Sequence, residues 1–415
     1  MSIFEGFLST AESLEAFGER HFLAAMLRFE ASLARAQATA GLIPQTAAQS
    51  IIDACKVELF DVSTIVRDSG RAGTLAIPLM TSLKETVGQF NPDAVRFVHF
   101  GSTSQDVIDT ALSLVTRDAL ALVQADVQIA IDALLMLAER HAAAPLLART
   151  LLQPASVTSF GLKCTGWVAP LIRSQQRLQI AAANALCVQL GGAVGTLAQM
   201  KTHGLEVIAL MAVDLQLKAP MATWHTQRDE WVALGCELGL LVGSLGKIAR
   251  DNSLMGQFDV PEVSEPTEAG RGGSSAMPHK RNPVACMVAL VAAQRAPQRV
   301  AALLAAMPQE HERALSHWQT ELAEWPGLLM SAHGSARAMA QALPGLQVDT
   351  ARMLTNLNAL RAVLPLDAAD EWFSPALALH AAAVTRNQLK TLTALNALNS
   401  IQSDDSPKTH TKAKR

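Results

Sequence analysis

Apolar residues recur at intervals of three and four along several long stretches of the chain, which is the period of one face of an α-helix. These stretches cover residues 20–40, 105–141, 160–190, 228–250 and 283–307. The second shows the pattern most clearly, with a stripe through Leu120, Val123, Val127, Ile131 and Leu134. β-Branched and aromatic runs are few. The pattern therefore predicts an all-α protein built from long helices.

Glycine and proline residues between these stretches divide the chain into regions. We expect an N-terminal helical domain at residues 1–100 and a central long-helix bundle at 101–345. The polar, basic residues 403–415 are predicted to be a disordered tail. Helices this long and apolar on several faces need more neighbours than one chain provides, which favours a bundle shared by several subunits.

Composition and charge exclude several classes of protein. The 415 residues carry a net charge of -3, so no basic surface for nucleic acid is expected. The five cysteines are scattered without a CxxC or Cys/His cluster, which predicts reduced thiols and no metal. The N-terminus lacks the pattern of a signal peptide. The apolar stretch 231–248 is interrupted by Glu237 and Lys247, which favours a buried helix over a membrane span. We expect a cytoplasmic protein with no membrane or nucleic-acid partner.

Two polar stretches stand where long helices begin. The first, Gly101 to Asp106, places Ser102, Thr103 and Ser104 directly before an apolar run. Hydroxyl residues at this point cap a helix, and the free amides of its first turn attract anions. The simpler alternative is a cap with no ligand. The second stretch, residues 149–158, contains Gln153 and several hydroxyl residues that could equally serve a turn.

A third stretch, residues 270–283, carries more specific information. Its glycines and serines predict a mobile loop, and Asn282 followed by Pro283 predicts the cap and first residue of a helix. Lys280 would then lie at the positive end of that helix, which suits a carboxylate-rich ligand. The alternative is a flexible surface loop with incidental basic residues. The glycine spacing excludes a P-loop.

The letters GSSAMPHKRNP, from Gly273 to Pro283, resemble the signature of the fumarase/aspartase superfamily. Within it, four further segments resemble the bacterial 3-carboxymuconate cycloisomerases: residues 99–110, 189–197, 224–229 and 309–315. The similarity runs from near Phe4 to about Leu357. It implies a three-part helical protein whose long helices form a 20-helix core in a homotetramer, with active sites shared between subunits.

The resemblance also implies a reaction on a small polycarboxylate without cofactor or metal. One carboxylate of a tricarboxylic diene adds across a conjugated double bond and closes a lactone. By position, Ser274 is the expected proton donor to carbon, assisted by Lys280. The expected contacts for the substrate are His99, Ser102, Thr103, Ser104, Gln153, His225, Arg228, Ser275, Asn282 and Arg313.

Some of these residues allow a structural reading from sequence. His99 could be a satisfied structural histidine, His225 and Arg228 could pair with Asp229 or Glu230, and Arg313 could pair with Glu310 or Glu312.

Two departures from the family pattern bear on the reaction. Lyases that release amines or alcohols usually carry a histidine where this chain has Leu151. A carboxylate nucleophile is already ionised at neutral pH and needs no base there, which favours a cycloisomerase. Beyond Leu357 the chain shows little family likeness, and residues 346–402 are predicted to form a shortened or divergent C-terminal helical region. An adenylosuccinate-type lyase and a catalytically inert relative remain the alternatives.

Overall fold

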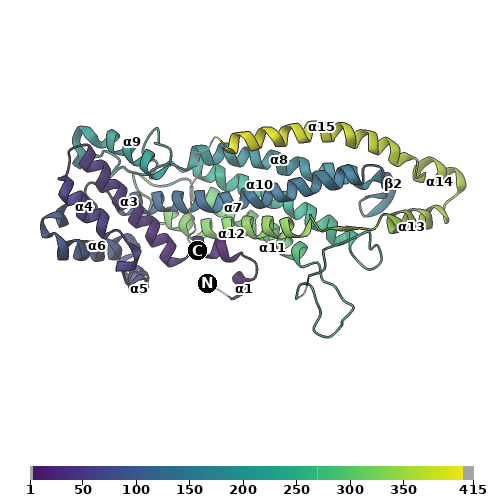
Figure 1. Ribbon diagram of the computed structural model, residues 1–415, viewed down its shortest axis with the longest axis horizontal. Coiled ribbons are helices and arrows are strands. Elements are labelled where there is room, and N and C mark those ends of the chain that lie inside the picture. The colour runs from purple at the N-terminus through teal and green to yellow at the C-terminus, as the bar shows by residue number, and fades with distance from the viewer. Residues whose placement is uncertain (1–2, 269, 405–415) are drawn as a thin grey trace. The chain divides into compact units, whose positions relative to one another are not determined.

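The computed structural model describes residues 3–268 and 270–404 of the chain (Figure 1). The α-helices are α1 (Ile3–Gly6), α2 (Ala11–Ala16), α3 (Glu19–Thr39), α4 (Gln45–Ala54), α5 (Val62–Ala72), α6 (Ala76–Phe90), α7 (Ser104–Arg140), α8 (Phe160–Ala185), α9 (Gly204–Leu215), α10 (Asp229–Met255), α11 (Val284–Ala305), α12 (His317–Ala342), α13 (Thr350–Arg361), α14 (Leu366–Phe373) and α15 (Leu377–Asp404). Short 3₁₀ helices are η1 (Val57–Leu59), η2 (Pro92–Phe97) and η3 (Ala198–His203).

The long helices predicted from periodicity are confirmed. The stripe on α7 is buried throughout, because each of its five apolar residues from Leu120 to Leu134 is at most 3% exposed. Pro297 lies inside α11 and Pro326 inside α12, so neither residue ends its helix. The helix α8 ends at Ala185, five residues before the apolar pattern stops.

Four short strands accompany the helices. β1 (Pro145–Thr150) and β2 (Gln153–Ser159) form an antiparallel hairpin, and β3 (Val263–Ser264) pairs with β4 (Gln347–Val348). The second polar stretch of the sequence is thus a hairpin rather than an irregular turn. Its two turn residues, Leu151 and Leu152, have positive φ angles of 50° and 66°.

The chain separates into two compact units, and the long helices pass from one to the other. Unit 1 comprises residues 1–121, 179–236 and 298–330. In it α3 packs against α4 and α9, and Arg35 of α3 pairs with Asp214 of α9. Unit 2 comprises residues 122–178, 237–297 and 331–415.

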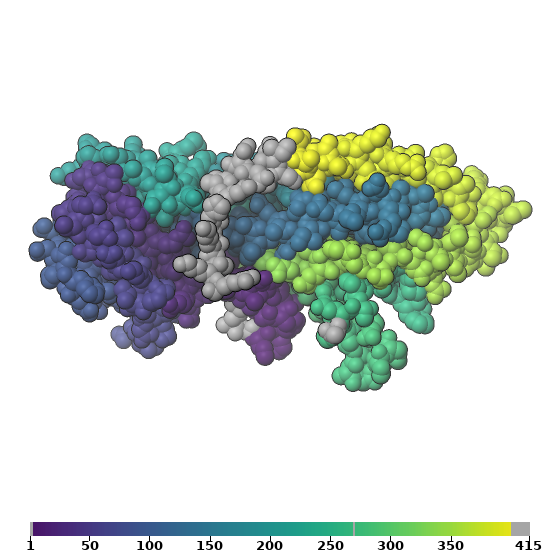
Figure 2. All heavy atoms as spheres, viewed as in Figure 1, coloured from purple at the N-terminus to yellow at the C-terminus, as the bar shows by residue number. Residues whose placement is uncertain are grey.

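The C-terminal region of unit 2 is helical and folds back on the bundle. The helix α15 lies along α8 (Figure 1), where Thr165 Oγ1 donates a hydrogen bond of 2.6 Å to Gln388 Oε1. Its side chains form part of the outer surface of unit 2 (Figure 2). Leu357 of α13 and Phe373 of α14 form an apolar cluster with Leu147 and Val157 of the hairpin. The predicted tail begins inside α15, and its residues 405–415 lie outside the described part of the chain.

By length and composition alone, α7 and α10 could cross a membrane. In their most apolar windows, however, 50% and 56% of the residues are buried within the protein. Core helices of globular proteins show the same combination, so these two helices are weak evidence for a membrane span.

Candidate active site

A buried carboxylate organises the first polar stretch, at the beginning of α7 in unit 1. Asp106 is completely buried and accepts hydrogen bonds from the amides of Gly191 at 3.0 Å and Gly192 at 2.9 Å. His225 Nε2 donates to it at 2.7 Å, and the amide of Thr103 at 3.1 Å. Three segments far apart in sequence are therefore fixed around one side chain. Asp106 lies three residues after Thr103, the spacing of a reciprocal helix cap, and this spacing is the sequence signal that could have revealed its capping role.

The glycines at 191 and 192 are required for this close approach. A Cβ atom at Gly191 would lie 2.8 Å from His225 Cε1, and one at Gly192 would lie 2.9 Å from the carbonyl oxygen of Gly101. Gly192 also has a φ of 67°, which residues with a side chain seldom adopt. The segment thus presses directly against the start of α7.

Arg228 is buried in a network of charges with Asp109 and Glu321. Its guanidinium donates to Asp109 Oδ2 at 2.9 Å and to Glu321 Oε2 at 3.0 Å, and its side chain is 0% exposed. Burial lowers its pKa, but the two carboxylates outweigh this and raise it. Its partners are not the neighbouring acidic residues considered from sequence. His225 is likewise bonded to Asp106. His225 and Arg228 therefore contact buried carboxylates of α7, as residues that position a site do.

Arg313 and Ser102 retain buried polar atoms that lack partners in the described protein. Arg313 Nη2 donates to Thr103 Oγ1, and its Nη1 lies 3.4 Å from Gln105 Oε1. Arg313 Nε and Ser102 Oγ, by contrast, have no hydrogen-bond partner among the described residues. Buried donors without partners are costly, and a bound carboxylate would satisfy both. Ser104 is the first residue of α7 and adds free amides at the same place.

His99 is bound to a buried glutamate of α3. Its Nδ1 donates to Glu30 Oε1 at 2.6 Å, and Glu30 is 1% exposed. Burial lowers the pKa of His99, but the charge and hydrogen bond of Glu30 outweigh it, so the pKa is raised above 6.5. His99 has a φ of 60°, and its carbonyl accepts from the amide of Ser102 at 3.3 Å.

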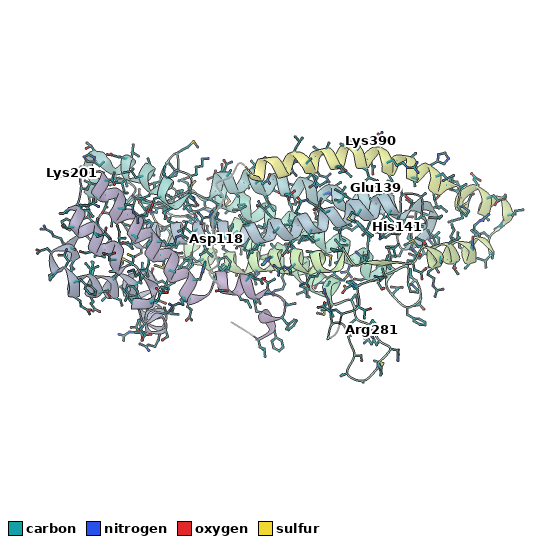
Figure 3. The ribbon with its side chains drawn as sticks, viewed as in Figure 1. Asp118, Glu139, His141, Lys201, Arg281 and Lys390 are labelled. Carbon is teal, nitrogen blue, oxygen red and sulfur yellow. The ribbon has the colours of Figure 1, made fainter. Side chains whose placement is uncertain are left out.

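The third polar stretch is an exposed loop in unit 2, between α10 and α11 (Figure 1); Arg281 marks its position in Figure 3. Ser274 Oγ accepts hydrogen bonds from the amides of Met277 at 3.1 Å and Ala276 at 3.4 Å. Ser275 and Lys280 are exposed on the same loop. The serine oxygen is thus held by two backbone donors, an arrangement that favours negative charge on that oxygen.

Asn282 closes the base of this loop. Its amide donates to the carbonyl of Gly272 at 2.8 Å, and its Nδ2 donates to that of Gly273 at 3.3 Å. A Cβ atom at Gly272 would lie 2.5 Å from the carbonyl oxygen of Asn282, so this glycine is needed for closure. The helix α11 begins at Val284, one residue later than the sequence predicted.

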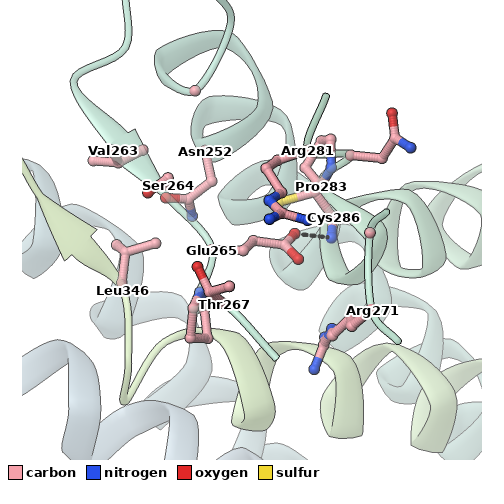
Figure 4. Close-up of a pocket in the computed structure, with 14 residues that line it drawn as sticks. Asn252, Val263, Ser264, Glu265, Thr267, Arg271, Arg281, Pro283, Cys286 and Leu346 are labelled. Atoms are coloured by element: carbon pink, nitrogen blue, oxygen red, sulfur yellow. Dashed lines mark hydrogen bonds between the residues drawn. The ribbon is translucent and has the colours of Figure 1, made fainter. Parts of the chain in front are cut away.

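The amino-terminal end of α11 is occupied by a carboxylate of the chain itself, which corrects the expectation that it serves a ligand. Glu265 accepts from the amide of Ala285 at 3.0 Å and from that of Cys286 at 2.8 Å, and Figure 4 shows Glu265 and Cys286 side by side. The charge of Glu265 therefore already meets the positive end of this helix. Lys280 and Asn282 must act through their own side chains.

Gln153 begins β2, directly after the exposed turn of the hairpin. The hairpin is anchored by Arg149, which bonds both oxygens of Glu262 at 3.0 and 2.9 Å, while Glu262 is completely buried. Leu151 and Leu152 at the turn are 96% and 75% exposed. Leu151 thus places an exposed apolar side chain at the position where amine- and alcohol-releasing lyases usually carry a histidine. The hairpin that carries it is anchored by the Arg149–Glu262 pair.

The structure groups the expected site residues into two sets. His99, Ser102, Thr103, Ser104, His225, Arg228 and Arg313 belong to unit 1, and Gln153, Ser274, Ser275, Lys280 and Asn282 to unit 2. Glu30 and Asp106, which hold members of the first set, were not singled out from sequence. In the described ranges no group of three acidic, histidine or cysteine side chains is placed to hold a metal ion.

A long-helix bundle with a glycine–serine loop and polar residues at a helix start is the arrangement that the resemblance to the fumarase/aspartase superfamily implied. The sequence profile of the lyase family matches residues 9–297. Two 3-carboxy-cis,cis-muconate cycloisomerases are similar over most of their length. The one from Pseudomonas putida is 42% identical over 88% of this chain and 87% of its own, and the one from Pseudomonas aeruginosa 45% identical over 86% and 78%.

Solved structures agree with this assignment. The 3-carboxy-cis,cis-muconate lactonizing enzyme from Pseudomonas putida matches with a TM-score of 0.86 at 35% identity, covering 96% of this chain and 99% of that one. A fumarate lyase from Mesorhizobium sp. BNC1 matches with a TM-score of 0.79 at 31% identity, covering 96% and 88%. The chain therefore belongs to the lyase family, within the group of the 3-carboxy-cis,cis-muconate cycloisomerases.

Proposed function

We propose that this protein is a 3-carboxy-cis,cis-muconate cycloisomerase, which converts its substrate into 4-carboxymuconolactone in protocatechuate degradation. The observation that carries the proposal is the loop from Gly273 to Pro283, with Ser274 Oγ held by two amides, in a chain 42% and 45% identical to enzymes of that name. The substrate is a small tricarboxylate, and the protein acts in the cytoplasm.

Ser274 donates the proton in this reaction. A carboxylate oxygen of the substrate forms a bond to carbon, and the electrons of the double bond move toward the carbon next to another carboxylate. That carbon takes the proton of Ser274, and the serine recovers a proton from water. The amides of Ala276 and Met277 stabilise the oxyanion left on Ser274, and the charge of Lys280 adds to this when the loop closes.

The other residues hold the substrate's carboxylates. The donors without partners on Ser102 and Arg313 form one carboxylate site together with Thr103, Ser104 and the start of α7. Gln153, Ser275 and Asn282 supply amide and hydroxyl donors from unit 2. His225 and Arg228 position the first set through Asp106 and Asp109, because their own donors are committed to those carboxylates.

We further propose a homotetramer in which each active site combines residues of different subunits. Large apolar side chains remain exposed on the long helices, including Ile129 at 47% and Met136 at 62% on α7, Ile180 at 66% on α8 and Leu240 at 53% on α10. Subunit contacts would bury them. Mixing two inactive variants, Ser274→Ala and Arg313→Ala, and reassembling them should then restore part of the activity. No recovery from well-formed mixed tetramers would contradict shared sites.

A substrate panel separates the three candidate functions. Purified protein is given 3-carboxymuconate and, in parallel, adenylosuccinate, and the absorbance of each substrate is followed. We expect turnover of the first only, because Leu151 cannot serve an amine leaving group as a histidine does. Release of fumarate from adenylosuccinate would make the protein a lyase of that type. No reaction with either would indicate an inert relative.

A further inference from the structure

More carboxylates than guanidinium groups lie around the start of α7. The carboxylates are those of Glu30 on α3, Asp106 and Asp109 on α7 and Glu321 on α12, each at most 1% exposed, and the guanidinium groups are those of Arg228 and the partly buried Arg313. Burial raises the pKa of Glu321. Without Glu321, the other three carboxylates still outnumber these two guanidinium groups. A further positive charge in this region would favour binding of a polyanionic substrate.

His99 is placed to supply that charge. Glu30 Oε1 accepts its Nδ1–H at 2.6 Å, whereas Glu30 Oε2 has no hydrogen-bond partner among the described residues. A carboxylate buried with a single partner is stabilised far better by an imidazolium than by a neutral ring. The φ of 60° at His99, uncommon for a residue with a side chain, shows that the surrounding structure holds this arrangement against a local cost.

We propose that Glu30 is a positioning residue for substrate binding, because it keeps His99 as an imidazolium beside Ser102–Ser104 so that this end of the site accepts a carboxylate. The inference rests on the proposed function and adds a residue that the sequence motifs do not contain. Glu30 lies on α3, about seventy residues before His99, and contacts the substrate only through it.

Other charged groups act on this pair. Asp106 of α7 favours the proton on His99, and Lys84 of α6 disfavours it. Beside Glu30, burial and then the charge of Glu30 raise the pKa of Cys55, so its thiol stays neutral, while Arg35 acts in the opposite direction. Because the pKa of His99 is raised, the imidazolium persists to higher pH than that of an unpaired histidine and is lost as the pH rises through the raised value.

The test compares the wild-type enzyme with Glu30→Gln across about pH 5.5 to 8.5, the range in which histidine titrates. We expect the KM for 3-carboxymuconate to rise about tenfold in Glu30→Gln near neutral pH, the size of one lost charge-assisted contact, with kcat little changed. At the acid end the two KM values should converge. The matched control is Glu206→Gln, which removes the partner of the exposed His203 at 3.0 Å and should follow the wild type.

A second measurement does not depend on turnover. Exchange of the C2 proton of His99, followed by mass spectrometry, reports its titration, which should move to lower pH in Glu30→Gln. Thermal unfolding shows whether Glu30→Gln is folded. If it is not, Glu30→Asp and His99→Gln are measured in its place. His99→Gln should raise KM and flatten its pH dependence.

An unchanged KM profile and an unchanged His99 titration in Glu30→Gln would overturn the proposal. If the titration moves and KM does not, Glu30 holds the imidazolium but the substrate does not use it, which also overturns it. A wild-type protein inactive on 3-carboxymuconate would instead contradict the proposed function.

Discussion

Removing Arg228 should destabilise the protein far more than removing an exposed arginine. In Arg228→Met, Asp109 keeps hydrogen bonds from Trp318 Nε1 at 2.9 Å and Gln105 Nε2 at 3.1 Å. Glu321, 1% exposed, loses every partner that it has among the described residues. Leaving a buried carboxylate without its counter-charge costs about 3–5 kcal/mol, which lowers the melting temperature of a 415-residue chain by about 3–6 °C.

Urea titration followed by tryptophan fluorescence measures this loss, because Trp224 lies 4.5 Å from the Arg228 guanidinium. The matched control is Arg35→Met, which removes an ion pair whose side chains are 47% and 35% exposed and should cost less than about 1 kcal/mol. Burial raises the pKa of Glu321, so its proton stabilises the variant at acid pH and is lost as the pH rises. The deficit should therefore be larger at pH 8 than at about pH 5. Equal losses in the two variants at neutral pH would refute the reasoning.

Three further changes test other parts of the structure. Gly272→Ala places a Cβ 2.5 Å from the carbonyl oxygen of Asn282, so kcat should fall at least about tenfold while the melting temperature stays near wild type. Gly270→Ala is the control, because no atom lies within 4 Å of its added Cβ, and its kcat should fall less. Glu262→Gln breaks the paired hydrogen bonds with Arg149 and should cost about 1–3 kcal/mol in thermal unfolding. Leu152→Asn relieves a φ of 66° at an exposed site and should stabilise the fold by about 1 kcal/mol; a lower melting temperature would contradict this.

The sequence predicted the parts of the fold that repeat along the chain. The apolar stripe of α7 was visible because a helical period persists over many residues. The hairpin was not, because leucines at positions 151 and 152 do not favour the left-handed conformation that its turn requires. Tertiary packing around Arg149 and Glu262 holds that turn instead.

The sequence suggested site residues only where several of them lie together in one short segment. Ser274 and Lys280 were proposed because the Gly273–Pro283 segment resembles the signature of a known superfamily. The partners that decide how a residue acts come from far away in sequence, and no local pattern reveals them. Glu321 lies 93 residues from Arg228, and Glu30 lies 69 from His99. Glu265, twenty residues before Ala285, occupies the helix end that the sequence had assigned to a ligand.

The central claim is that the Ser274 hydroxyl delivers a proton to carbon during lactone formation. It is tested most directly by kcat for 3-carboxymuconate in wild-type and Ser274→Ala enzyme, with the reaction also run in D₂O. We expect the wild type to place one deuterium on the carbon next to a carboxylate. Ser274→Ala should fold normally and lose at least about 100-fold in kcat, as expected for a missing general acid. A well-folded Ser274→Ala enzyme with the kcat of the wild type would contradict the claim.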